Sequence, residues 1–305
     1  MDAKVSYAAA RLNALGLLSC EGDDAQAFLH AQLTSDIARL GPREARRAGW
    51  CSAQGRLMAT LLVARYGGGF VLQLSADLAP SVAKRLAMFV LRAKVKLADA
   101  SGAWAQFGLW GPGASARLAE LGLEAPPETL GCAAGPSGIV VRVSAERFLV
   151  LAPISEEARL SGALADAGEQ AWFLQDIREG LPRVVLATQE HFVPQMVSLE
   201  RLGAIDFHKG CYPGQEIVAR TQYRGALKRR MVRARVAADA SAGDALFAED
   251  IPGQPAGVVV NAAAAPEGGS ELLAVLQIGS IEGGAQVRLG TPEGPVLERL
   301  PLPYA

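Results

Sequence analysis

The first hundred residues alternate between two hydrophobic periods. Apolar positions three and four residues apart predict helices at 27–33 and 82–90. Pro80 lies in the first turn of the second helix, where its missing N–H costs nothing. Short, mainly apolar runs bounded by turn residues predict strands at 15–19, 45–51, 56–66, 70–75 and 95–98.

The next hundred residues repeat this order of patterns. Strands are predicted at 104–110, 139–143 and 147–151, and helices at 114–121 and 155–167. Sequence identity between the two halves is negligible, so only the pattern repeats. Two tandem modules of the β-α-β-β-α type predict an α+β fold with two layers and antiparallel sheets.

Two stretches follow neither period. Residues 122–138 are rich in Pro, Gly and Ala and predict a loose loop. Residues 181–207 are also irregular, and a long segment of this kind in a compact protein is more often functional than idle. The second stretch leads directly into 209–216, where reactive side chains are densest.

The last part of the chain has short alternating stretches separated by Gly, Pro and Ala turns, at 232–236, 257–260 and 272–277. This pattern predicts a small antiparallel β-barrel or sandwich that starts near Lys228. The expected domains are therefore an α+β region over 1–227 and a C-terminal β-barrel over 228–305. The first region consists of two modules, at roughly 1–100 and 101–227, which can interleave.

Composition narrows the class of protein. With 305 residues, half of them hydrophobic, the chain can bury a sizeable core in two or three modules. Its formal net charge is -1, so no global charge attracts nucleic acid or an anionic membrane. No targeting pattern begins the sequence, and arginine or glycine interrupts the apolar runs before they reach membrane-spanning length. We therefore expect a soluble protein.

The cysteines are scattered and form no C-x-x-C pair, so neither a disulfide framework nor a zinc site is indicated. They are Cys20, Cys51, Cys132 and Cys211. A reducing cytoplasm fits this usage best. Only Cys211 has reactive neighbours, and the other three are expected to be structural.

The segment 209–216 reads Lys-Gly-Cys-Tyr-Pro-Gly-Gln-Glu, a combination that no core-packing pattern requires. A cysteine acts as a nucleophile or metal ligand through its thiolate, which a nearby cation or exposed backbone amides favour. Lys209 and the flanking glycines can supply both to Cys211. The alternative is that Cys211 is a small buried hydrophobe.

The neighbours of Cys211 also allow two interpretations each. His208 and Cys211 form an H-x-x-C pair, which is either half of a metal site or an ordinary hydrogen-bonded histidine beside a thiol. Gly214 lets backbone amides approach an anion, but neither nucleotide-binding glycine motif is present. Gln215 and Glu216 either contact a ligand or cap a following helix.

A run of seven cations without any acid spans the start of the predicted barrel, at Arg220, Arg224, Lys228, Arg229, Arg230, Arg233 and Arg235. It is either a surface for a polyanion or a solvated, partly alternating strand, and the neutral overall charge favours the strand. Trp50 and Trp172 are either core residues or platforms for a flat heteroaromatic ring, and position alone does not decide.

The segment 209–216 resembles the motif of the YgfZ family of folate-binding proteins, which are related to the glycine-cleavage T-protein and to a mitochondrial iron–sulfur assembly factor. The resemblance covers nearly the whole chain, because other stretches match the family in the same order. These stretches are 28–36 (FLHAQLTSD), 54–56 (QGR), 91–95 (LRAKV), 180–182 (GLP), 192–195 (FVPQ) and 223–229.

The resemblance implies three modules in a ring around a channel that holds tetrahydrofolate or a derivative, with a β-barrel as the third module. It implies iron–sulfur cluster proteins and their assembly machinery as partners, and a role in assembling or repairing iron–sulfur enzymes, including those that thiolate tRNA. Direct nucleic acid binding, a metal site and a membrane are not expected.

The resemblance also implies roles for individual residues. The functional cysteine falls on Cys211, with Lys209 beside it, and an indole that stacks on the pterin falls on Trp172. The other cofactor-binding residues that it implies are Arg92, Arg178, Glu179, Tyr212, Gly214, Gln215 and Glu216.

Two positions of the expected folate site depart from the family pattern. A second folate-site tryptophan falls on Leu15, so the pocket there must differ. A glutamate that meets the folate in T-proteins falls on Arg178, with Glu179 one residue further along.

A third departure concerns the reaction. The paired acids that serve aminomethyl transfer in T-proteins fall on Met58 and Ala59, which cannot do general acid–base work. This favours an accessory folate-binding protein acting through Cys211 over the alternative, a folate-dependent aminomethyltransferase. A third hypothesis, a folate-binding module without thiol chemistry, requires Cys211 to be buried and dispensable.

Overall fold

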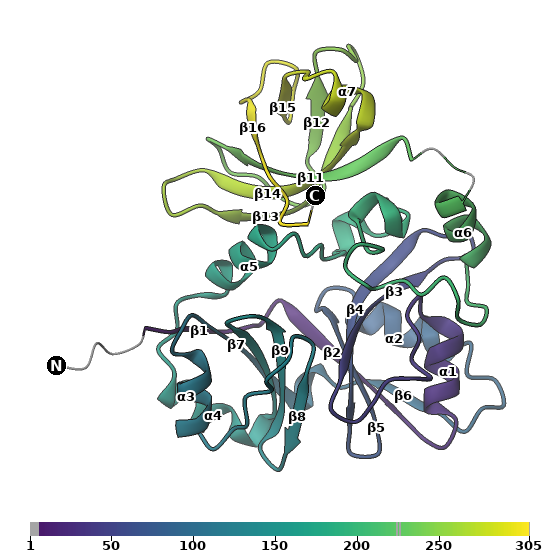
Figure 1. Ribbon diagram of the computed structural model, residues 1–305, viewed down its shortest axis with the longest axis vertical. Coiled ribbons are helices and arrows are strands. Elements are labelled where there is room, and N and C mark those ends of the chain that lie inside the picture. The colour runs from purple at the N-terminus through teal and green to yellow at the C-terminus, as the bar shows by residue number, and fades with distance from the viewer. Residues whose placement is uncertain (1–5, 224, 226, 305) are drawn as a thin grey trace. The chain divides into compact units, whose positions relative to one another are not determined.

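The computed structural model describes residues 6–223, 225 and 227–304. The fold is α+β, as predicted, and its three sheets are built from antiparallel strand pairs (Figure 1). Internal contacts divide the chain into two compact units. The first comprises residues up to 31, 36–48 and 61–172, and the second comprises 32–35, 49–60 and 173 onward.

The first sheet contains the strands predicted in the first hundred residues, in the order β3-β4-β5-β2-β6. The elements are β2 (Leu15–Glu21), α1 (Ala25–Gln32), β3 (Ala45–Cys51), β4 (Leu57–Tyr66), β5 (Gly69–Ser75), α2 (Ala79–Ala87) and β6 (Lys96–Asp99). Helix α2 starts with the predicted proline in its first turn and buries Val82 and Leu86, four residues apart, on one face.

The second sheet has the order β1-β7-β10-β9-β8. The elements are β1 (Ala8–Arg11), β7 (Trp104–Trp110), α3 (Ala114–Glu120), β8 (Cys132–Gly135), β9 (Gly138–Ser144), β10 (Arg147–Pro153) and α4 (Glu157–Ala163). In β7, Ala105, Phe107 and Leu109 belong to one core cluster together with Leu118 of α3 and Leu160 of α4. Their two-residue spacing places them on one face of the sheet, which these helices cover.

The third sheet is a nearly closed antiparallel barrel with the order β15-β12-β13-β14-β11-β16. Its elements are β11 (Arg229–Val236), β12 (Ala245–Ala248), β13 (Gly257–Ala264), β14 (Ser270–Gln277), α7 (Ile278–Glu282), β15 (Val287–Leu289) and β16 (Leu297–Leu300). An isolated bridge between Arg288 and Val296 links the two outer strands. The interior is aliphatic, with Leu246, Leu272 and Leu276 fully or almost fully buried.

The segment predicted to be irregular contains only short 3-10 turns, at Leu186–Thr188 and Pro194–Val197. Helices α5 (Glu169–Arg178) and α6 (Gln215–Tyr223) flank it. The prediction of a loop at 122–138 is partly wrong, because Cys132 and Ala133 are buried in β8, which pairs with β9. No helix in the described part of the chain is both long and apolar enough to cross a membrane.

Substitution of Gly108 in β7 tests the packing on the other face of this sheet, opposite to the face that carries Phe107. A methyl group added there would lie 2.5 Å from Cδ2 of Trp172, so Gly108→Ala forces the indole to move. We expect the free energy of unfolding to fall by about 2 kcal/mol, measured by denaturant titration with circular dichroism.

Gly102→Ala is the matched control, because no atom lies within 4 Å of its added methyl group. Its unfolding free energy should stay the same or rise slightly, since alanine restricts the unfolded chain. Equal effects of the two substitutions would contradict the described contact between Gly108 and Trp172.

Candidate functional site: an exposed thiol loop before helix α6

The candidate site is the segment 209–216, which connects the irregular segment to α6. Its second glycine, Gly214, has a φ of +78°, a conformation that favours glycine. A Cβ there would lie 2.5 Å from the carbonyl oxygen of Ser52 and 2.6 Å from Cα of Gly55. Only glycine therefore allows the start of α6 to lie against the turn between β3 and β4.

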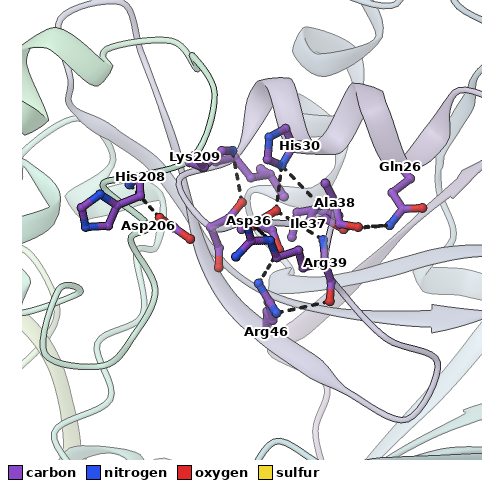
Figure 2. Close-up of polar contacts among 12 residues, drawn as sticks. Gln26, His30, Asp36, Ile37, Ala38, Arg39, Arg46, Asp206, His208 and Lys209 are labelled. Carbon is purple, nitrogen blue, oxygen red and sulfur yellow. Dashed lines mark hydrogen bonds and ion pairs between the residues drawn. The ribbon is translucent and has the colours of Figure 1, made fainter.

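The ammonium group of Lys209 is engaged with the backbone (Figure 2). Its Nζ donates to the carbonyl oxygens of Leu33, at 2.5 Å, and Ser35, at 3.1 Å. It also lies 5.2 Å from the centre of the Tyr212 ring, within cation–π range. The charge of Lys209 thus attaches the thiol loop to the 33–35 segment.

Thr34 strengthens the same attachment from inside the 33–35 segment. Its hydroxyl donates to the carbonyl of Ala204, at 2.6 Å, and accepts the N–H of Gly49, at 2.7 Å. Its carbonyl accepts the N–H of Asp206, at 2.9 Å. The residue is fully buried, so each of these hydrogen bonds would be expensive to break.

Tyr212 is the buried residue of the loop. Burial is the main cause that raises the pKa of its phenol, and the nearby Cys51 and Asp206 raise it further. The phenol is therefore neutral at physiological pH and packs beneath the loop.

Cys211 is exposed, whereas the other three cysteines are buried. Burial raises the pKa of Cys20 and Cys51 to about 12 and that of Cys132 to about 11. A buried thiol held in its protonated form is a poor nucleophile. The structure thus separates Cys211 from the other cysteines, and the alternative of a buried hydrophobe at Cys211 is wrong.

The polar residues next to the thiol loop and at its end have neighbours that are close in sequence. The backbone N–H of His208 donates to Oδ1 of Asp206, at 2.8 Å, and its side chain is exposed (Figure 2). Glu216 lies in the first turn of α6, where its negative charge interacts favourably with the positive end of the helix dipole. Among the described residues, no group of three His, Cys, Asp or Glu side chains is arranged to hold a metal ion.

Trp172 belongs to the first unit, and its indole is only 3% exposed. The guanidinium carbon of Arg147 lies 4.0 Å from the ring centre, and Trp110 meets the ring edge-on at 5.8 Å. Gly108 contacts the same ring, as described above. The indole is thus packed by this chain's own residues, and its expected role in folate binding stays a prediction.

Arg178, at the end of α5, is held by an acid of the barrel. Its Nε and Nη2 donate to Oε1 of Glu271 at 2.9 and 2.6 Å. Oε2 of the same carboxylate lies 3.4 Å from Nη2 of Arg233. The buried carboxylate of Glu271 thus lies between two guanidinium groups, and Arg178 joins α5 to β14.

The other expected site residues belong to different elements. Arg92 is exposed in the loop after α2, in the first unit, whereas Glu179 follows α5 in the second. Met58 and Ala59 are buried in β4. Trp50 is also buried, as a core residue would be.

Four of the seven cations in the run at 220–235 lie in β11, the first strand of the barrel. There, Arg230 pairs with Glu200 at 3.1 Å, and Arg235 approaches Glu267 to 4.0 Å. Arg224 lies outside the described residues. The interpretation of this run as a partly alternating strand is therefore confirmed for β11.

Two features of the site were not predicted from sequence. The carbonyls of Leu33 and Ser35 bind Lys209, and the only signal for this was the motif match at 28–36. The contact between the guanidinium group of Arg147 and the ring of Trp172 had no signal in the sequence, because the two residues are 25 positions apart.

The fold can now be compared with known proteins. Residues 7–128 match the family of the GCVT N-terminal domain. The crystal structure of the glycine cleavage system aminomethyltransferase T from Bartonella henselae matches with a TM-score of 0.79 and 17% identity, over 99% of this chain and 87% of that chain. The protein therefore has the aminomethyltransferase T fold.

Relatives that are similar in sequence identify the family more narrowly than the fold does. The tRNA-modifying protein YgfZ of Vibrio vulnificus (strain YJ016) is 30% identical over 304 residues, which cover 96% of this chain and 91% of that protein. The same protein from Edwardsiella ictaluri (strain 93-146) is 33% identical over 221 residues, 70% of this chain and 66% of that protein. The chain belongs to the YgfZ family.

The exposure of the thiols can be tested directly. In the folded protein at about pH 8, dithiobis(nitrobenzoate) should react quickly with one of the four thiols, and with all four after denaturation. Cys211→Ser should abolish the fast phase. A fast phase that persists in this variant, or that disappears in Cys132→Ala, would contradict the described burial.

Proposed function

We propose that the protein is a folate-binding accessory protein in the assembly or repair of iron–sulfur cluster proteins, including tRNA-thiolating enzymes, and that it acts through Cys211. The observation that carries this proposal is the exposed thiol of Cys211 on a loop fixed by Lys209 and Gly214, while the other cysteines are buried. The relatives named as tRNA-modifying proteins support a role related to tRNA modification.

The proposed chemistry needs a partner to reach the sulfur atom. An exposed cysteine can exchange electrons, sulfur or a mixed disulfide with a partner protein, provided that a thiolate is populated and accessible. The loop meets the second condition. Its neighbour Lys209 hydrogen-bonds to carbonyl oxygens, so we assign to Lys209 the positioning of the loop rather than proton transfer.

The side chains expected at the folate site suit a folate chemically. An indole can stack on a pterin, a carboxylate can accept its ring N–H groups, and a guanidinium can pair with the glutamate tail. A bound reduced folate supplies ring nitrogens that carry one-carbon units. In the described conformation Arg147 lies over Trp172, so stacking on that face requires the guanidinium to move.

The aminomethyltransferase alternative is weaker. The likeness to aminomethyltransferase T, at 17% identity, concerns the fold alone. At the positions where T-proteins have paired acids, the side chains of Met58 and Ala59 are apolar and buried in β4. They offer no group that takes up a proton or stabilises a developing positive charge.

The thiol is tested by complementation of a bacterial strain that lacks its own family member. We expect Cys211→Ser to fold normally but to leave tRNA thiolation, measured by mass spectrometry of the modified nucleosides, at the level of the empty vector. The control, Cys132→Ala, should restore thiolation. Full rescue by Cys211→Ser would contradict the proposed thiol chemistry.

The cofactor is tested by calorimetric titration with tetrahydrofolate under anaerobic conditions. We expect the parent protein to bind it and Trp172→Phe to bind it about fivefold more weakly, because phenylalanine offers a smaller stacking surface. Trp104→Phe is the control and should change the affinity by less than about twofold. Absence of binding to the parent protein would eliminate the folate proposal.

A further inference from the structure

An open cleft of about 690 Å³ lies in the second unit, bordered by the segment 190–196 and by β12, β13 and β14 of the barrel. This volume is within the range of small-molecule sites in proteins. Its apolar lining includes Met196 and Val258, which are partly exposed, and beneath them Phe192 and Val275 are buried. Neither Cys211 nor any residue expected to bind folate is among the residues that line it.

The wall formed by 190–192 is fixed by hydrogen bonds to the start of β4. The N–H of Leu57 donates to the carbonyl of Phe192, and the N–H of Glu190 donates to the carbonyl of Leu57, both at 2.8 Å. Nη1 of Arg56 donates to the carbonyl of His191 at 2.9 Å. Glu190 has a φ of +64°, which is uncommon for a residue with a side chain. The wall is therefore held in its conformation before any ligand arrives.

The charged lining has an excess of positive charge. It consists of two guanidinium groups, Arg56 and Arg229, one carboxylate, Glu190, and the imidazole of His191. The bond to His191 uses only one of the N–H groups of Arg56. Arg229 is exposed. Guanidinium groups bind carboxylates, phosphates and sulfonates through paired hydrogen bonds.

We propose that this cleft is a second ligand site, which binds a small molecule with an anionic head group on an apolar body. Arg56 and Arg229 bind the head group, and Met196 and Val258 contact the body. A concave, pre-formed site with a few polar groups on an apolar lining favours a small molecule over a flat protein surface. The inference is independent of the folate and thiol proposals, because it uses none of their residues.

The test uses anilinonaphthalene sulfonate, an anionic and largely apolar fluorescent probe, and phenylnaphthylamine, its neutral counterpart. Fluorescence titration gives the affinity of each probe, and calorimetry gives the stoichiometry. The parent protein should bind one sulfonate probe per chain. Arg229→Ala should weaken this binding about tenfold, because it removes a charge-assisted hydrogen bond, and Arg229→Glu should weaken it further.

Two controls separate the head group from the body. Arg220→Ala removes an exposed arginine that does not line the cleft and should leave both affinities unchanged within about twofold. The neutral probe should bind the Arg229 variants as well as it binds the parent protein. The proposal is overturned if the parent protein does not bind the sulfonate probe, or if both Arg229 variants bind it with parental affinity.

Discussion

The thiol loop depends on the ammonium group of Lys209, which hydrogen-bonds to carbonyls 174 and 176 positions earlier in the chain. Hydrogen bonds from a charged donor are stronger than neutral ones. Here they join two segments that are far apart in the sequence. Thr34 adds three hydrogen bonds at the same junction. The segment 33–35 and the motif at 209–216 are therefore parts of one structural element within the second unit.

A loop held in this way can present a reactive group without being flexible. Lys209 and Tyr212 are turned toward the protein, while Cys211 between them is exposed. Gly214 allows the following helix to approach the turn at 52–55 closely. The rigid parts of the motif thus determine where the sulfur atom is offered to a partner.

Sequence predicted much of the fold because the period of the hydrophobic pattern is local. Strands β3 and β7 were predicted with their observed ends, since their apolar runs have clear boundaries. Helix α5 was not predicted, because Trp172, Phe173 and Leu174 are consecutive buried residues and give no helical period. Strand β8 was missed because alanine and glycine carry little strand propensity, and pairing with β9 overrides that preference.

The candidate site was only partly predictable for the same reason. The polar and glycine residues beside Cys211 indicated an exposed thiol as one of two alternatives, and the structure decides for it. The partners of Lys209 and Arg178 are distant in sequence, and nothing in the local pattern indicates that Arg178 binds Glu271. Charged side chains find such partners only once the tertiary structure has formed.

The division of the chain into interleaved segments has a consequence for biosynthesis. Residues 32–35 and 49–60 emerge early from the ribosome but belong to a unit whose remaining residues begin at 173. During translation these early segments lack their partners, and Leu33 cannot bind Lys209 until the chain is 176 positions longer. The non-local pairing slows folding and leaves buried strand ends exposed for that interval. The second unit can therefore complete its fold only after the second half of the chain has been made.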